Sequence, residues 1–349
     1  MLRTFFSDRL DNRMLGALMR LDDAIVNRRP QCMLYGLGES DLKPLQIAYV
    51  SEHPESYYCF LQSLTGVATP DGLQLNLFYN DACDEALFEE HLQEIYDRLD
   101  RSIDSYTSEY SVAKLVYDYF AANVKADYDA QEVFHQVQNR VNEMSRARSS
   151  QTEISAVWDE FIREHGNVFT AYGAIVEKKA VCMGFSLAYR LVLTHYGLDV
   201  TCLSGEYGNG PHMLNAVSIG DKRAFVDITR GLVCDALPFV QYDMFLMPAS
   251  RATYFTPDED LGCDATDLHY FAREKLRFRD LFALRRYLSS YIYTATDGAI
   301  RFYYSGRGVK DDKICDIAEE MLAERCGNEY QIAARTVSHG IGNFHMLKK

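Results

Sequence analysis

Residues 182–229 constrain the fold more than any other part of the sequence, because a helical pattern is followed there by strand patterns. A helix is predicted over 182–196, with a glycine directly after it as a stop signal. A strand is expected around 200–204. Apolar runs at 213–219 and 224–229, joined by a Gly-Asp-Lys triplet, predict a β-hairpin. The core order is therefore a helix followed by antiparallel strands.

The length of 349 residues exceeds the usual size of one compact domain, so several folding units are expected. Hydrophobic residues make up 48% of the chain and charged residues 25%, values that indicate folded domains rather than disorder. Local patterns divide the chain into an N-terminal α+β region (1–100), a central domain (105–245) with a helical insertion (131–165), and a C-terminal α+β region (246–349).

Helical spacing is clearest in the central domain. Apolar residues between Val112 and Val124 predict a helix, with Ser108 and Ser111 as candidate N-caps. The insertion is expected to consist of two exposed helices separated by a polar break at 149–152. Further patterns occur outside this domain: an amphipathic stretch at 85–99, strand-like runs at 290–293 and 300–304, and a helix at 314–325.

Charge and cysteine usage exclude several classes of function. A net charge of -14 without a long basic run argues against a nucleic-acid partner. Asp8 and Asp11 interrupt what a signal peptide needs as an apolar core, and no later stretch approaches a membrane-spanning length, so we expect a cytoplasmic protein with no membrane partner. The 9 cysteines form no CxxC pair, which fits neither a disulfide framework nor a zinc cluster. No metal or cofactor is expected.

Cys182 stands at the predicted start of a helix, where a thiol ionises readily. A helix N-terminus and a neighbouring imidazolium both stabilise the thiolate, which is the nucleophilic form. A cysteine at a helix start is, on its own, more often structural than catalytic, so its partners decide the matter. The backbone N–H of Cys182 is a candidate oxyanion donor; the sequence identifies no second donor, and Tyr172 is the one residue considered.

His212 and Asp227 are the candidate partners. His212 follows a loop rich in glycine and precedes a strand, which would fix its ring at a sheet edge. Asp227 is flanked by apolar residues and needs a hydrogen-bond donor if it is buried. A turn centred near Asp221 would place Asp227 opposite Asn215, about one residue pair from His212. We therefore predict a triad in which Cys182 attacks a carboxamide carbon, His212 transfers the proton and Asp227 orients the imidazole.

Two segments, AVCMGFSLAYRLVLTHYGLDVTCLSG and GPHMLNAVSIGDKRAFVDIT, resemble the core of the transglutaminase-like family. The family pattern is Cys-x-Gly-Tyr-Ser, then His-x-x-Asn, then Val-Asp-x-Thr, and the similarity extends over about residues 105–230. The resemblance places the family nucleophile on Cys182, the histidine on His212 and the aspartate on Asp227. It implies an α+β, papain-like (transglutaminase-like) core in which the helix carrying the nucleophile packs on an antiparallel sheet.

The same resemblance implies cysteine-dependent acyl transfer on a peptide or side-chain amide, so a protein or peptide substrate is expected. Hydrolysis is favoured over transfer to an amine, because transfer requires a site that excludes water and binds the amine. The alternative is a catalytically inactive module that keeps the fold for protein interaction. The sequence leaves the oligomeric state open.

Overall fold

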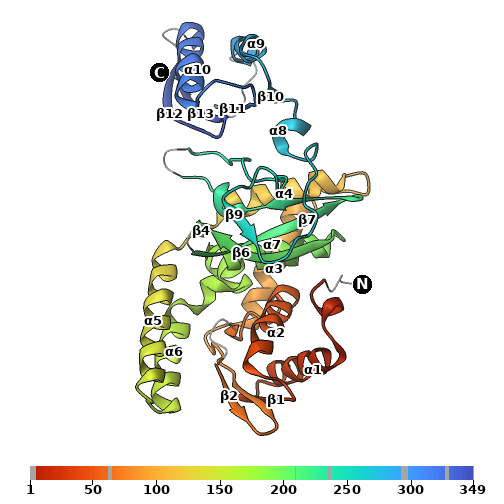
Figure 1. Ribbon diagram of the computed structural model, residues 1–349. Helices are drawn as coiled ribbons and strands as arrows, with labels where there is room; N and C mark the ends of the chain where they lie inside the picture. The colour runs from red at the N-terminus through yellow and green to blue at the C-terminus, as the bar shows by residue number, and fades with distance from the viewer. Residues whose placement is uncertain are drawn as a thin grey trace.

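The computed structural model describes residues 5–61, 65–208, 210–234, 237–291, 298–326 and 330–348. Three parts are stacked along the long direction of the molecule, with the N-terminal part at one end, the central part in the middle and the C-terminal part at the other end (Figure 1). Each part combines helices with a largely antiparallel sheet. The chain therefore has a mixed α+β fold.

The N-terminal part places helices against a three-stranded antiparallel sheet in the order β1-β3-β2. Its elements are α1 (Asn12–Val26), β1 (Gln31–Tyr35), α2 (Glu39–Glu52), β2 (Thr65–Thr69), β3 (Gly72–Asn76) and α3 (Glu85–Leu99). The amphipathic stretch at 85–99 is confirmed as helix α3, and the side chain of Asp84 caps it by accepting a hydrogen bond from the backbone of Leu87.

The central part contains the helix-then-hairpin block. Its elements are α4 (Glu109–Asn123), β4 (Lys125–Ala126), α5 (Tyr128–Arg146), α6 (Gln151–His165), the short helices η3 (Gly166–Phe169) and η4 (Gly173–Glu177), β5 (Lys179–Ala180), α7 (Cys182–His195), β6 (Val200–Tyr207), β7 (Gly210–Ile219), β8 (Lys222–Val226), η5 (Ile228–Arg230) and β9 (Phe255–Pro257). Of the two candidate caps of α4, Ser108 is the N-cap and accepts the backbone N–H of Ser111.

Helices α5 and α6 form a hairpin that extends from the central part alongside the N-terminal part (Figure 1). The predicted pair of helices is confirmed, with α6 starting after the cap residue Ser150. The hairpin has its own apolar cluster, in which Trp158 and Phe161 pack with Phe60 of the N-terminal part and Phe169 of η3. This cluster joins the hairpin to the rest of the molecule.

The central sheet has the strand order β8-β7-β6-β9, and all its neighbouring strands are antiparallel. Helix α7 packs on one face and α4 packs on α7, whereas the loop around 244–263 covers the other face. Strand β9 lies beyond the predicted domain boundary at 245, and Met247 bridges to Phe225 of β8. Residue 245 therefore lies within the segment that packs on the central sheet. The sequence did not indicate β9, because a strand of three residues has too little periodicity to be recognised.

The C-terminal part is a four-stranded sheet in the order β10-β11-β13-β12, packed against helices. Its elements are α8 (Tyr270–Arg273), β10 (Arg277–Phe278), α9 (Leu281–Tyr291), β11 (Ala299–Tyr304), α10 (Asp311–Cys326), β12 (Tyr330–Ser338) and β13 (Ile341–Lys348). The strand predicted at 300–304 and the helix predicted at 314–325 are confirmed. The strand predicted at 290–293 is wrong at 290 and 291, which end α9, and its other residues lie outside the described ranges.

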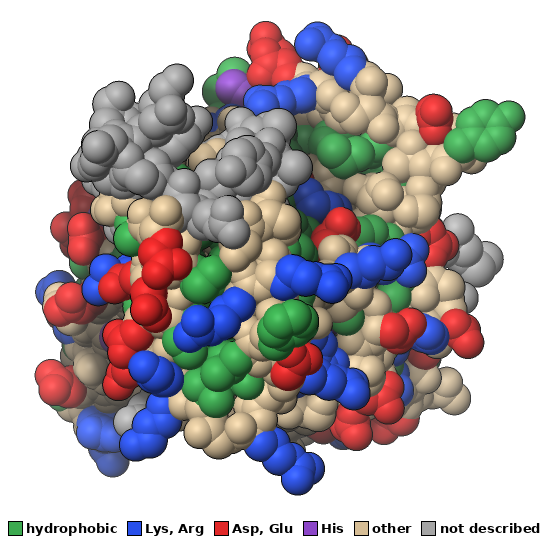
Figure 2. All heavy atoms as spheres, turned by 90° about the horizontal axis from the view of Figure 1, so that it is seen from above, with side chains coloured by type: hydrophobic (Ala, Val, Ile, Leu, Met, Phe, Trp, Pro, Cys, Tyr) green, Lys and Arg blue, Asp and Glu red, His purple; other side chains and the backbone are tan. Residues whose placement is uncertain are grey.

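Acidic and basic side chains are interspersed over the face at the C-terminal end (Figure 2). Within the described ranges, every helix is too short or too polar to traverse a lipid bilayer.

Gly205 of β6 pairs with His212 of β7 and also lies against β9. A Cβ at this position would overlap the carbonyl oxygen of Thr256 and the ring of Phe255. Gly205→Ala is therefore expected to push β9 away and to lower the free energy of unfolding by about 1–3 kcal/mol, measured by urea titration. Gly210→Ala is the control, because a Cβ there meets no atom within 4 Å. Equal losses in the two variants would contradict the packing argument.

Candidate active site

Cys182 is the first residue of α7, and the N-cap residue before it, Val181, makes no side-chain capping hydrogen bond. The N–H groups of a first helical turn have no partners within the helix, and a helix start favours a negatively charged group. The preceding residue, Val181, donates its N–H to the carbonyl of Val168, which fixes the chain just before the thiol. Gly184 lies so close to the same carbonyl that a Cβ would overlap it. The small residue in the motif thus allows the helix start to pack tightly.

His212 of β7 and Asp227 at the end of β8 form a buried pair. The Nε2 atom of His212 lies 2.8 Å from Oδ2 of Asp227, and the two side chains are 14% and 1% exposed. The thiol of Cys182 interacts electrostatically with the same imidazole, and the two residues line the same cavities. The structure therefore brings together all three residues singled out in the sequence.

The strand register differs by one residue from the prediction. Asn215 pairs with Val226, not with Asp227, because the hairpin turn comprises only Gly220 and Asp221. Asp227 instead leaves the strand and caps η5: its Oδ1 atom accepts the backbone N–H of Thr229 at 3.0 Å. The second carboxylate oxygen is thereby directed to His212, so the triad geometry depends on the cap rather than on strand pairing.

The helix that carries Cys182 is hydrogen-bonded to the strand that carries His212. The hydroxyl of Ser186 donates to the carbonyl of Met213 at 3.2 Å, and the amide Nδ2 of Asn215 donates to the carbonyl of Ser186 at 3.0 Å. All three residues are buried. Ser186 and Asn215 occupy the serine and asparagine positions of the family pattern, and their bonds hold the thiol and the imidazole at a fixed separation.

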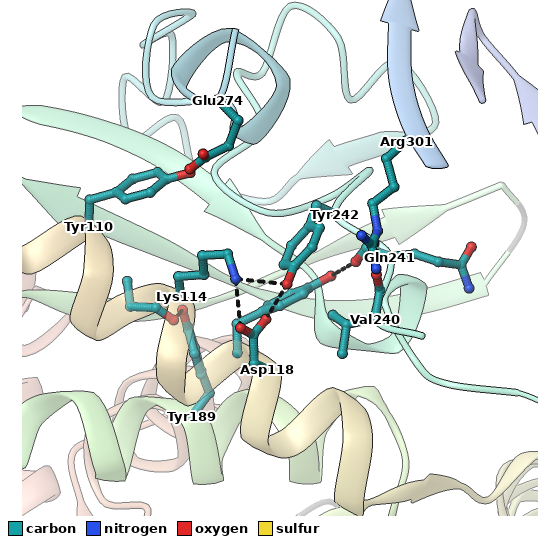
Figure 3. Close-up of polar contacts among 11 residues, drawn as sticks. Tyr110, Lys114, Asp118, Tyr189, Val240, Gln241, Tyr242, Glu274 and Arg301 are labelled. Atoms are coloured by element: carbon teal, nitrogen blue, oxygen red, sulfur yellow. Dashed lines mark hydrogen bonds and ion pairs between the residues drawn. The ribbon is translucent and has the colours of Figure 1, made fainter. Parts of the chain in front are cut away.

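The loop after η5 is anchored on α4. Lys114 and Asp118 of α4 both bond to the hydroxyl of Tyr242, each at 2.8 Å (Figure 3). Tyr117 donates its hydroxyl to the carbonyl of Gln241 at 2.9 Å. Gln241 in turn donates its N–H to the carbonyl of Gly231, the residue directly after η5, so these contacts help to hold η5 in place.

The pKa of His212 is shifted by its surroundings. Burial of the ring lowers the pKa, but the hydrogen bonds and charges of Asp227 and Cys182 outweigh burial and raise it from 6.5 to about 10. The imidazolium form is therefore favoured at neutral pH. An imidazolium beside a thiol stabilises the thiolate, the form that attacks a carbonyl carbon.

A His212→Gln variant is expected to be less stable than the wild type, and the difference should depend on pH. Because folding raises the pKa of His212, its protonation stabilises the folded state fully below about pH 6.5, and this contribution is lost as pH rises toward about 10. Urea unfolding of both proteins between pH 6 and pH 10 should show the difference in unfolding free energy shrinking. A difference that stays constant over this range would exclude a raised pKa for His212.

Two cavities border the Cys182–His212 pair. The larger, of about 370 Å³, is here called the apolar cavity. Its apolar side chains come from α2, α5, the segment before α7, α7 itself and β7: Ile47, Val50, Phe134, Phe169, Val181, Met183 and Met213. The smaller, of about 230 Å³, is here called the Arg230 cavity and is also lined by Asp127, Tyr128, Tyr207 and Thr229. The cavities give a substrate two different surroundings next to the thiol.

Two residues of these cavities were missed in the sequence. Gln131 of α5 lines both cavities, and its carboxamide makes no hydrogen bond within the described part of the chain. Arg230 lines the smaller cavity. Neither belongs to the family pattern. The sequence marks Gln131 only by its place near the start of a helix, and Arg230 only by its place directly after the Asp-x-Thr segment. Tyr172, considered as an oxyanion donor, is buried and accepts the backbone N–H of Asp84, and it lines neither cavity.

In the described ranges, no group of three or more His, Cys, Asp or Glu side chains is arranged to hold a metal ion. Every cysteine whose surroundings the structure describes is a free thiol.

No family model matches the sequence, and no curated protein matches it. Two similar chains among solved structures are "Crystal structure of a TGase" and a "Putative Cysteine Protease from Cytophaga hutchinsonii". The first is 15% identical with a TM-score of 0.30, over 48% of this chain and 43% of its own. The second is 13% identical with a TM-score of 0.24, over 51% of this chain and 53% of its own. The chain is thus similar, over about half of each length, to a TGase and to a chain described as a cysteine protease.

Proposed function

We propose that the chain is a cysteine-dependent acyl-transfer enzyme that acts on peptide or side-chain amides. The observation that carries the proposal is the combination of a thiol at an uncapped helix start with an imidazole that is hydrogen-bonded to a buried carboxylate. Such an arrangement generates a nucleophile, a proton donor and an orienting group within one small volume.

The proposed reaction starts with attack of the Cys182 thiolate on the amide carbon. The carbonyl oxygen gains negative charge and is bound by the backbone N–H of Cys182, with the carboxamide of Gln131 as the second donor that we propose. His212 gives its proton to the leaving nitrogen, the C–N bond breaks and an acyl-thioester remains. Water then attacks the thioester carbon and returns its proton to His212, which releases the carboxylic acid and the thiolate.

Hydrolysis is the outcome that we propose over transfer to an amine. Cys182 is partly exposed, so water reaches the thioester directly, whereas an amine acceptor needs a binding site of its own. Whether water or an amine accepts the acyl group can be measured directly.

The test is intact-mass analysis after incubation with a broad peptide pool and an amine donor, with wild type and Cys182→Ala compared. Cleaved peptides that require Cys182 support a peptidase or amidase, and amine adducts that require Cys182 identify a transamidating enzyme. Products that are the same with and without the thiol, or no products at all, would contradict the proposal and favour a binding module that keeps the fold.

A further inference from the structure

The Arg230 cavity places a cation, the guanidinium of Arg230, next to the thiol. Arg230 is exposed and lines this cavity together with Cys182 and His212. Across the residues that the structure describes, its guanidinium makes no ion pair and no hydrogen bond. The chain as a whole has a net charge of -14, so an unpaired cation here is a local departure from the overall charge.

The guanidinium is held in place by aromatic rings rather than by acids. It lies over the rings of Tyr207 and Tyr254, at 5.5 Å and 5.9 Å from their centroids. A guanidinium above an aromatic face keeps its planar set of N–H donors available for a carboxylate.

The backbone of Arg230 is fixed relative to the triad. Arg230 is the last residue of η5, which Asp227 caps, so one carboxylate positions both His212 and this short helix. The next residue, Gly231, accepts the N–H of Gln241 at 3.0 Å, and a Cβ on Gly231 would overlap the hydroxyl of Tyr117. The cation therefore stays close to the thiol.

The acidic groups near Arg230 are paired with a different cation or hydrogen-bonded to another side chain. Asp127 lines the same cavity, but it is buried and pairs with Lys179 at 2.6 Å. Asp243, whose charge acts on Arg230, is partly buried, does not line the cavity and accepts the amide of Asn343 at 3.1 Å. The net charge offered to a ligand in the Arg230 cavity is therefore positive.

We propose that Arg230 binds a carboxylate of the substrate beside the amide that Cys182 attacks. This inference rests on the proposed acyl-transfer function. The apolar cavity borders the same thiol, so it accommodates an apolar side chain of the same substrate. The substrate class is thus a peptide with an apolar residue near the reacting amide and a carboxylate that reaches Arg230, from an Asp or Glu side chain or from the chain terminus.

Alkylation of Cys182 tests the anion site without any turnover. Iodoacetate and iodoacetamide have the same leaving group and nearly the same size, but only iodoacetate carries a carboxylate. Peptide mapping follows the alkylation rate of Cys182 with each reagent. The rate with iodoacetate divided by the rate with iodoacetamide, normalised to the same ratio for N-acetylcysteine, reports a cation beside the thiol. Arg230→Gln is expected to lower this ratio by about tenfold or more, and Arg230→Lys should keep an intermediate ratio.

Arg140→Gln is the matched control, because Arg140 is an exposed residue of α5 that lines neither cavity and its loss changes the net charge equally. Its ratio should equal that of the wild type. A ratio that Arg230→Gln leaves unchanged would overturn the inference. If the ratio depends on Arg230 but Cys182 reacts no faster than N-acetylcysteine, the anion site stands and the proposed catalysis fails.

Matched peptides then identify the source of the carboxylate. One pair differs by Glu or Gln beside the cleaved bond, and a second pair by a C-terminal carboxylate or carboxamide. For the pair that contains the true ligand, the ratio of kcat/KM between acid and amide should fall by about tenfold or more in Arg230→Gln. Cleavage with the same ratio in wild type and Arg230→Gln for both pairs would overturn the inference.

Discussion

A Cys182→Ser variant is expected to lose at least about 10⁴-fold in kcat/KM for amide substrates, although it changes one atom. A hydroxyl is far harder to ionise than a thiol, and the imidazolium of His212 cannot act as a base toward it. The raised pKa of His212, about 10, keeps the ring protonated at neutral pH, which suits a thiolate but not a serine nucleophile. Steady-state cleavage of the peptides identified in the pool experiment measures the loss.

Cys234→Ser serves as the control for this substitution. Cys234 is exposed and lines neither of the two cavities, so the variant should keep its activity within about twofold. A Cys182→Ser protein that unfolds at the same urea concentration as the wild type and still turns over substrate would refute the thiol mechanism.

Asp227→Asn is expected to lower kcat by about 10²- to 10⁴-fold and to move the alkaline limb of the pH–rate profile to lower pH. The hydrogen bond and the charge of Asp227 contribute to the raised pKa of His212, so a neutral amide lets the imidazolium lose its proton at lower pH. Since His212 must be protonated to donate to the leaving nitrogen, activity should then fall at lower pH than in the wild type. Rates measured from pH 5 to pH 10 show both effects.

Thr229→Val separates the orienting role of Asp227 from its charge. This variant removes the hydroxyl that donates to Oδ1 but keeps the backbone N–H bond and the carboxylate. A loss of about tenfold or less, with the alkaline limb in its wild-type position, is expected. An alkaline limb that Asp227→Asn leaves in place would show that the carboxylate does not set the pKa of His212.

Local patterns predicted the helix and the hairpin because both are determined by neighbours in sequence. Helix α7 begins at Cys182 as predicted, and the hairpin turn lies at Gly220 and Asp221. The one-residue error in register arose because a Gly-Asp-Lys triplet allows more than one turn length. It did not separate His212 from Asp227, since the carboxylate reaches the ring from its position as the cap of η5.

The surroundings of the thiol could not be predicted in the same way. Ile47 and Phe134, which line the apolar cavity, come from α2 and α5, elements far apart in sequence. Only packing of the N-terminal part and the helical hairpin against the central sheet brings them together, and no local pattern encodes that contact. Gln131 and Arg230 were missed for the same reason, because their importance depends on what lies beside them in space.

Trp158 gives the molecule an optical reporter at a useful place. It is the only tryptophan in the chain, it is buried in the cluster of the helical hairpin, and its ring centroid lies 6.0 Å from that of Phe134. Phe134 also lines the apolar cavity. A ligand that enters this cavity and displaces Phe134 should alter the surroundings of the indole, so the intrinsic fluorescence of unlabelled protein offers a direct binding signal and reports separately on the unfolding of the hairpin.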